Sequence, residues 1–259
     1  MKIFRFLLLY TALSSFFLFS YIFFPLSLSG QPSIIETIQG VLPSLVEVTA
    51  ENFGAVSSPQ TTAAIDKNTG RLFVLRPVKT AYWKKSGAGV IIDASGLIVT
   101  NFHTIAKANR ISVTLHNNTN LSAKIVRMFP QEDFVLLKIE SPIPFIPIPF
   151  ADSNTIRLGE KIFTIGHSHL LDQTISEGKI IGIGTSQSKN PNNTDADIIQ
   201  VNLNIYRGDS GGPLLDHRGA LIGLMVAAQI QKDRSSFAIA SNKIKKRYLE
   251  YLSSSKNKK

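Results

Sequence analysis

The hexapeptide Gly208-Asp209-Ser210-Gly211-Gly212-Pro213 is the most informative stretch of this chain of 259 residues. Glycines on either side of a serine let the backbone turn sharply and leave the hydroxyl exposed. The same turn lets neighbouring N–H groups point at one spot, so the amides of Gly208 and Ser210 are candidates for an oxyanion hole. Because serine alone is a weak nucleophile, the motif predicts a general base elsewhere in the chain.

His103 and Asp133 are the candidates for the base and for the group that orients it. His103 follows the apolar stretch 97–100, and Asp133 directly precedes the apolar stretch 134–139. A buried Asp133 would accept a hydrogen bond from the imidazole, fix its tautomer and stabilise the imidazolium. Glu132, its immediate neighbour, is the rival orienting carboxylate. The order His, Asp, Ser is that of chymotrypsin-like proteases, which draw the first two residues from one barrel and the serine from the other.

Short strands dominate the body of the chain. Apolar runs alternate with turn signals such as Asp93-Ala94-Ser95-Gly96, which predicts hairpins. The runs form two halves, one on each side of residues 141–150, where alternating prolines exclude a helix or a central strand. We therefore predict an all-β fold with two small antiparallel barrels, at about residues 43–140 and 151–242.

Four further segments complete the predicted organisation. Ser33 and Glu36 have capping-box spacing, which predicts a short amphipathic helix. Residues 51–85 are polar and too long for an ordinary connection, so we expect a functional or flexible loop. A short final helix should begin at Ser241, and residues 253–259 should form a solvated basic tail, with a contact to anionic lipid as the minority interpretation.

Residues 1–30 predict export from the cytoplasm. Phe6–Leu28 carries no charge and follows Lys2 and Arg5. As a helix it would be about 34 Å long, enough for a hydrocarbon core of about 30 Å. Ser27-Leu28-Ser29 resembles a cleavage site, but the apolar run exceeds the roughly 7 to 15 residues of a signal peptide. We expect a single-pass inner-membrane anchor with a periplasmic body, and secretion to the periplasm after signal cleavage is the alternative.

The composition excludes several classes of protein. The chain has no Cys, which excludes a disulfide scaffold, a cysteine-ligated zinc site and a thiol enzyme. The net charge is +10, but the excess lies at the two ends, so no nucleic-acid partner is expected. His167 and His169 have a spacing that could bind a metal. No third ligand is apparent, so no metal or cofactor is expected, and a metal-dependent hydrolase is a minor alternative. His116 and His217 lie in predicted turns.

Three sequence blocks resemble the protease domain of the HtrA/Deg family, trypsin-like serine proteases of the cell envelope. Residues Gly87–Asp93 with Thr100–His103 are similar to its histidine block, Asp133–Ile139 to its aspartate block and Ile199–Pro213 to its serine block. The resemblance covers about residues 33–250. It implies two six-stranded barrels within a domain at 31–252, and a homotrimeric endopeptidase that cleaves misfolded or regulatory proteins. The anchor resembles the membrane-tethered Deg branch.

The resemblance also implies a pocket for the substrate side chain that precedes the cut. In the trypsin-like fold, the residue six positions before the nucleophile lies at the base of this pocket, and here that residue is the uncharged Asn204. The other walls should be small or apolar: Met225, Val226, Ala227, Ser236 and Ala238. Ser236 stands where the family usually has Gly, so we expect a shallow pocket.

The chain departs from the family's pattern in three places. Only 18 residues follow Ser241, so no C-terminal PDZ domain is expected. Asp209 stands where the family usually has Asn, and Arg207 is its candidate partner. Residues 166–169, Gly-His-Ser-His, replace a Gly-Asn-Pro. A catalytically silent, protease-like chaperone or binding scaffold is the alternative function, and the intact glycine and triad set argues against it.

Overall fold

The computed structural model describes residues 33–57, 62–65, 72–75, 78–167, 173–184, 197–203, 205, 208–226 and 235–256. Within residues 55–80, and at 167, 173, 174 and 256, the description is of the backbone only. Residues 34–259 form one compact unit.

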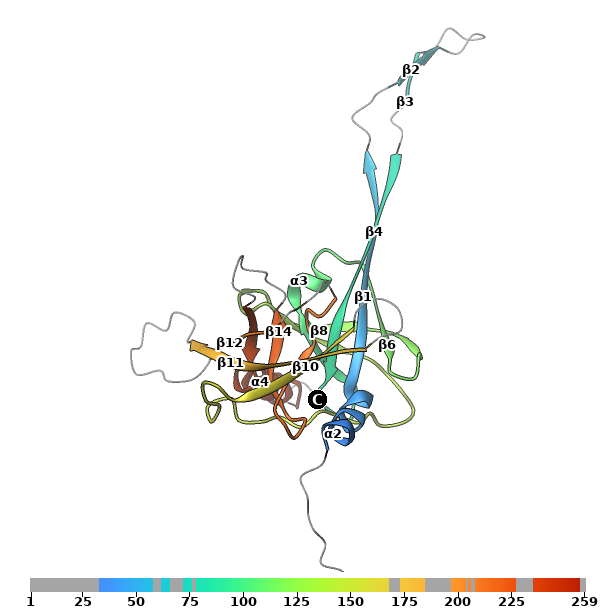
Figure 1. Cartoon of the computed structure of the whole chain (residues 1–259). Helices are drawn as coiled ribbons and strands as arrows, with labels where there is room; N and C mark the ends of the chain where they lie inside the picture. Colours follow the sequence, from blue (N-terminus) through green and yellow to red (C-terminus); the bar gives the residue numbers. More distant parts are fainter. Residues whose placement is uncertain are drawn as a thin grey trace, which may run out of the picture. The chain divides into compact units, whose positions relative to one another are not determined.

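The first half of the protein is a curled sheet of seven antiparallel strands, in the order β7-β6-β1-β4-β5-β9-β8 (Figure 1). Its strands are β1 (Leu45–Ser57), β4 (Val78–Ile91), β5 (Leu97–Asn101), β6 (Arg110–Leu115), β7 (Asn120–Ser122), β8 (Lys124–Phe129) and β9 (Phe134–Lys138). The outer strands β7 and β8 are joined by one residue, Ala123, whose N–H donates to the carbonyl of Ile111 at 3.0 Å. The two edges of the sheet therefore meet at Ala123.

This first half differs from the predicted six-stranded barrel. The single run predicted at residues 121–128 is split at Ala123 into β7, which pairs with β6, and β8, which pairs with β9. The bend occurs because one continuous stretch has to change partners around a buried alanine. The prediction is correct in strand content, and the sheet curls around its core without forming a continuous closed ladder.

The second half is a closed barrel of six antiparallel strands, as predicted, in the order β10-β11-β12-β15-β14-β13. Its strands are β10 (Lys161–His167), β11 (Gln173–Gly184), β12 (Ile198–Val201), β13 (Pro213–Leu215), β14 (Leu221–Val226) and β15 (Ser236–Ala240). The proline-rich connector predicted at 141–150 contains neither helix nor strand, and its last residue, Phe150, forms an isolated bridge with Leu221. It ties the halves together, because Ile148 N–H donates to Ile91 O and Leu221 N–H donates to Pro149 O.

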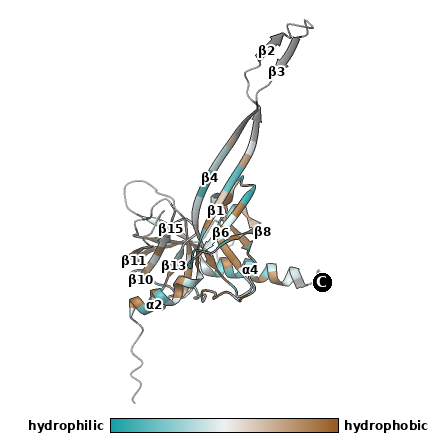
Figure 2. Cartoon of the chain, turned by 90° about the vertical axis from the view of Figure 1, so that its right-hand side faces the viewer, coloured by the Kyte–Doolittle hydropathy of each residue, from teal (hydrophilic) through white to brown (hydrophobic). Residues whose placement is uncertain are grey.

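Three clusters of buried side chains form the core. One fills the first sheet, one fills the barrel, and the third lies between them and includes Val99, Leu136, Ile165 and Leu224 from the two halves. Figure 2 shows this concentration of hydrophobic residues where the strands gather. Because the third cluster draws on both halves, side chains at their junction are held by one continuous packing unit.

The predicted loop over residues 51–85 is wrong for most of its length. β1 and β4 stay paired as far as Ser57 and Val78, beyond the rest of the sheet, and form a ribbon visible in Figure 1. A further hairpin follows, of β2 (Thr62–Ile65) and β3 (Leu72–Leu75). The rings of Phe53 and Tyr82 face each other across the ribbon at 4.9 Å, and Asn109 bonds the backbone N–H and C=O of Phe53 at 3.2 and 2.9 Å. These contacts stabilise the ribbon in spite of the polar composition of its sequence.

Helices flank the two sheets. They are α2 (Ile34–Val41), the 3₁₀ turn η1 (Leu42–Ser44), α3 (Phe102–Ile105), the 3₁₀ turn η2 (Pro130–Glu132) and α4 (Ser241–Lys256). α4 is longer than the predicted short helix and includes residues 253–256 of the expected basic tail. Ser253 and Ser255 extend its last turn, because their hydroxyls donate to the carbonyls of Leu249 and Leu252. No helix in the described ranges is long and apolar enough to cross a membrane, and Phe6–Leu28 lies outside those ranges.

Candidate active site

The structure brings together the three predicted residues His103, Asp133 and Ser210. Nδ1 of His103 lies 2.8 Å from Oδ2 of Asp133, and Nε2 lies 3.3 Å from Oγ of Ser210. His103 lies in the short helix α3 and Asp133 in the turn between η2 and β9, both in the first half of the protein, and Ser210 lies in the loop before β13. The imidazole therefore bridges the carboxylate and the hydroxyl with its two nitrogens, which is the geometry that proton transfer from serine requires.

The backbone around Asp133 fixes this carboxylate beside His103. Asp133 has φ of 53°, a left-handed conformation, and its carbonyl accepts hydrogen bonds at 3.1 Å from Phe102 N–H and from Asn101 Nδ2. Its Oδ1 accepts the backbone N–H of His103 at 3.0 Å. The side chain is 33% exposed, whereas a buried carboxylate was predicted. The difference arises because the turn before β9 holds Asp133 at the surface rim and not within the sheet.

Glu132, the rival orienter, points away from the imidazole. Its carboxylate pairs with Arg247 of α4, at 3.0 Å from Nε and 2.5 Å from Nη2. Asp133 makes both hydrogen bonds to His103. The structure thus assigns the orienting contact to Asp133 and gives Glu132 a different partner.

The loop that carries Ser210 is held by the first sheet as well as by the barrel. Ala88 N–H donates to the carbonyl of Ser210 at 2.8 Å, and Gly211 N–H donates to the carbonyl of Met225 at 2.9 Å. Gly208 and Gly211 have φ of 111° and 83°, which favour glycine. Ser210 itself is only 8% exposed, against the exposed hydroxyl expected from the motif, because β4 packs over the loop. The oxyanion-hole role of Gly208 and Ser210 stays a prediction.

Replacing Gly211 by alanine is expected to disable the site. The new Cβ would collide with the carbonyl of Ala88 and with Oγ1 of Thr100, and the residue would keep a φ of 83°. We expect a loss of peptidase activity of roughly 100-fold, since small displacements of a reacting group are costly. Gly159→Ala is the matched control, because Gly159 has the same φ of 83° but open space around its Cβ position.

The control should cost about 1 to 2 kcal/mol of unfolding free energy, from backbone strain alone, and leave activity intact. Denaturant unfolding and kcat/KM for both variants give the comparison. Equal activity losses in the two variants would show that left-handed strain, and not displacement of the serine loop, is responsible.

Asp209 is buried against Gly166. A Cβ at position 166 would overlap the Asp209 carboxylate, so the glycine at the start of the Gly-His-Ser-His stretch leaves room for this acid. Arg207, the predicted partner of Asp209, lies outside the described residues. Any larger residue at position 166 would therefore displace the Asp209 side chain beside the nucleophile.

The predicted pocket residues are only partly described. Asn204 and Ala227 lie outside the described residues. Met225 and Ala238 pair across β14 and β15 and are buried in the barrel core, Val226 is half-buried, and the Ser236 hydroxyl donates to the carbonyl of Leu203 at 2.8 Å. These residues lie on adjacent strands, and their role as pocket walls stays a prediction.

The remaining histidines are only partly described. His116 and His217 are exposed, as predicted from their turns. The side chains of His167 and His169 are outside the described residues, so a metal-dependent hydrolase that uses them stays a prediction from the sequence.

Comparison with known proteins identifies the fold family. A family model described as a trypsin-like peptidase domain matches residues 87–224, a range that contains His103, Asp133 and Ser210. The chain belongs to this family. Its relatives include periplasmic Deg endoproteases, which confirms the resemblance to the HtrA/Deg family for the protease domain.

Three of these relatives differ in their identity to this chain and in the share of each chain that is covered. The chain is 34% identical over 217 residues to the periplasmic pH-dependent serine endoprotease DegQ of Escherichia coli K12, covering 82% of this chain and 46% of DegQ. It is 30% identical over 238 residues to the periplasmic serine endoprotease DegP of the same strain, covering 83% and 50%. It is 38% identical over 153 residues to the chloroplastic Protease Do-like 1 of Arabidopsis thaliana, covering 58% and 35%. The chain thus spans half or less of the length of these relatives.

Proposed function

We propose that this protein is a serine endopeptidase that works through an acyl-enzyme on Ser210. The observation that carries the proposal is the continuous contact from Asp133 through His103 to Ser210, at 2.8 and 3.3 Å. His103 takes the hydroxyl proton as Oγ attacks the peptide carbonyl, and then gives it to the leaving amine. Asp133 keeps the imidazole in the required tautomer. The amides of Gly208 and Ser210 stabilise the oxyanion, a donor of this kind contributing roughly 3 kcal/mol in the transition state.

The direct test of this function uses the wild-type protein and a serine-directed fluorophosphonate probe. The active enzyme should be labelled on Ser210 and should hydrolyse an unfolded model protein, and labelling should abolish the hydrolysis. The alternative, a silent protease-like scaffold, would bind the unfolded protein without labelling or cleavage. Cleavage that persists after complete labelling would point to different chemistry.

We further propose that the catalytic body acts in a bacterial periplasm on misfolded or regulatory proteins. Two relatives, DegQ and DegP, are named as periplasmic endoproteases, and the apolar run Phe6–Leu28 suits an inner-membrane anchor. The homotrimer is an inference from the family resemblance. Carbonate extraction of membranes tests the anchor, and a body released with a new amino terminus near Gly30 would indicate a cleaved signal instead.

Cleavage is expected after small or medium apolar residues such as Ala or Val. Asn204 at the pocket base would leave a Lys or Arg side chain buried without a counter-ion, which is costly. Differences of one methylene are worth about 1 to 3 kcal/mol, so the preference should be graded. Mass-spectrometric mapping of cut sites in a peptide library, compared with Ser210→Ala, measures it. A profile dominated by Lys or Arg would refute the pocket assignment and leave the triad untouched.

A further inference from the structure

The C-terminal helix contacts the turn that carries Asp133. Arg247 of α4 bonds Glu132 with Nε at 3.0 Å and Nη2 at 2.5 Å, and Nη1 bonds Glu250 at 2.9 Å. The Glu132 side chain is only 15% exposed, so this pair is shielded from water more than an ordinary surface salt bridge. Glu132 is the residue next to Asp133, and the pair joins positions 115 residues apart in the chain.

The turn between β8 and β9 is held on a second side by aromatic packing. The rings of Phe129 and Phe134, which flank the turn, stack at 4.7 Å, and the Arg247 guanidinium lies over Phe129 at 5.6 Å. Within the turn, Asp133 N–H donates to the carbonyl of Pro130 at 3.3 Å. Arg247 therefore touches the turn both at Glu132 and at its aromatic base.

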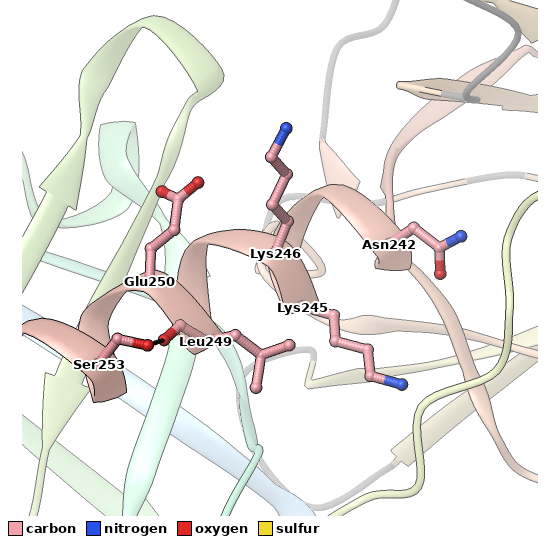
Figure 3. A pocket seen from close by; sticks show the side chains of 6 residues that line it. All are labelled: Asn242, Lys245, Lys246, Leu249, Glu250 and Ser253. Atoms are coloured by element: carbon pink, nitrogen blue, oxygen red, sulfur yellow. Dashed lines mark hydrogen bonds between the residues drawn. The ribbon is translucent and has the colours of Figure 1, made fainter.

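The segment of α4 that carries Arg247 is packed firmly against the rest of the protein. Ile244 is fully buried in the core shared by the two halves, and the Tyr248 hydroxyl donates to Asp93 Oδ2 at 3.3 Å. Burial and the neighbouring Asp93 raise the pKa of Tyr248. Figure 3 shows residues that line a pocket along α4, among them the exposed Lys245, Lys246 and Leu249, together with Glu250, the second partner of Arg247. The side of α4 that faces the protein thus presents Arg247 from a well-anchored turn of helix.

Electrostatics favour this arrangement. The hydrogen bonds that Arg247 donates to Glu132, and secondarily to Glu250, raise the pKa of Arg247, whose guanidinium is charged at any working pH of a peptidase. Without that charge, Glu132 would be an unpaired carboxylate on the residue next to Asp133. Two competing carboxylates next to one imidazole would give it two places to donate its Nδ1 proton.

We propose that Arg247 is a positioning residue for Asp133: by holding Glu132 it fixes the left-handed turn and keeps the second carboxylate away from His103. The catalytic consequence rests on the proposed peptidase function. The geometric consequence, an intact His103–Asp133 hydrogen bond, does not depend on it.

Arg247→Met is the principal test, because methionine keeps much of the apolar stem and removes the charge. We expect kcat to fall roughly 10- to 100-fold, as for a misplaced catalytic group, with KM within about twofold of wild type. Arg247→Lys should restore part of the loss. Glu132→Gln, which keeps the side-chain shape, should lower kcat less, and the double variant should be no worse than Arg247→Met alone, since both changes break one interaction.

Lys243→Met is the matched control. Lys243 lies on the same helix and pairs with Asp197 at 3.5 Å; its side chain is 19% exposed against 36% for Arg247, so its removal disturbs α4 at least as much. Its loss should lower the melting temperature about as much as Arg247→Met and leave kcat unchanged. Equal losses of kcat in the two variants would overturn the proposal, because the effect would then be general destabilisation of α4.

A spectroscopic readout separates this proposal from the proposed function. The Nδ1 proton of His103, shared with Asp133, should give a low-field proton NMR signal in wild type that is lost or broadened in Arg247→Met and kept in Lys243→Met. If wild type and Ser210→Ala were equally inactive, the peptidase proposal would fail while the NMR comparison still decided the role of Arg247. An unchanged signal in a folded Arg247→Met would refute the positioning role.

Discussion

Ser210→Ala is expected to lower kcat for peptide-bond hydrolysis by roughly 10⁴-fold or more, with little change in KM. The serine oxygen lies 3.3 Å from His103 Nε2, and alanine leaves the base with nothing to deprotonate. His103→Ala should cause a loss of the same size. Because the two residues act as one unit, the double variant should be no worse than either single one.

A matched control for this experiment is Ser44→Ala. Ser44 is as buried as Ser210, and its hydroxyl donates to the carbonyl of Ile146 at 2.9 Å, away from the triad. Its loss should reduce stability by about 1 kcal/mol, the net value of one hydrogen bond, and leave kcat unchanged. Steady-state hydrolysis of one fluorogenic peptide by the wild type and the four variants gives the comparison. Near-normal hydrolysis by purified Ser210→Ala would mean that another residue performs the chemistry.

The triad was predictable because its signals are local. Ser210 lies among glycines that only a tight turn requires, and His103 and Asp133 each stand at the end of an apolar strand. The barrel of the second half was predictable for a related reason, since its strands are short apolar runs separated by clear turn residues. In these stretches the hydrophobic pattern and the turn chemistry agree with the final pairing.

Features that depend on distant partners could not be read from the sequence. The polar composition of the β1–β4 ribbon is typical of a loop. The hydrogen bonds between Asn109 and Phe53 that support the ribbon join residues 56 positions apart. The pairing of Glu132 with Arg247 spans 115 positions, and nothing local distinguishes Glu132 from Asp133 as an orienter. The split of one predicted strand at Ala123 likewise follows from which neighbours the two pieces find.

Asp133→Asn is expected to lower kcat by about 10⁴-fold, because it traps the imidazole in the wrong tautomer. Asp133 accepts two hydrogen bonds, from the His103 backbone N–H at Oδ1 and from Nδ1 at Oδ2. An asparagine has one acceptor oxygen and one donor NH₂. If the oxygen keeps the backbone bond, the NH₂ faces Nδ1, the ring proton moves to Nε2, and His103 can no longer accept the proton of Ser210.

The matched control for this substitution is Asp216→Asn. Asp216 is buried, and its Oδ1 accepts the N–H groups of Arg218 and Ala220 in the turn before β14, so the change disturbs a carboxylate of similar local role. It should cost stability and spare kcat. For Asp133→Asn, KM and the melting temperature should stay near wild type while kcat collapses, and the fluorophosphonate should label Ser210 far more slowly. A variant that kept more than about a tenth of the wild-type kcat would show that the tautomer of His103 is fixed by some group other than Asp133, since the wrong tautomer alone accounts for a loss about a thousandfold larger.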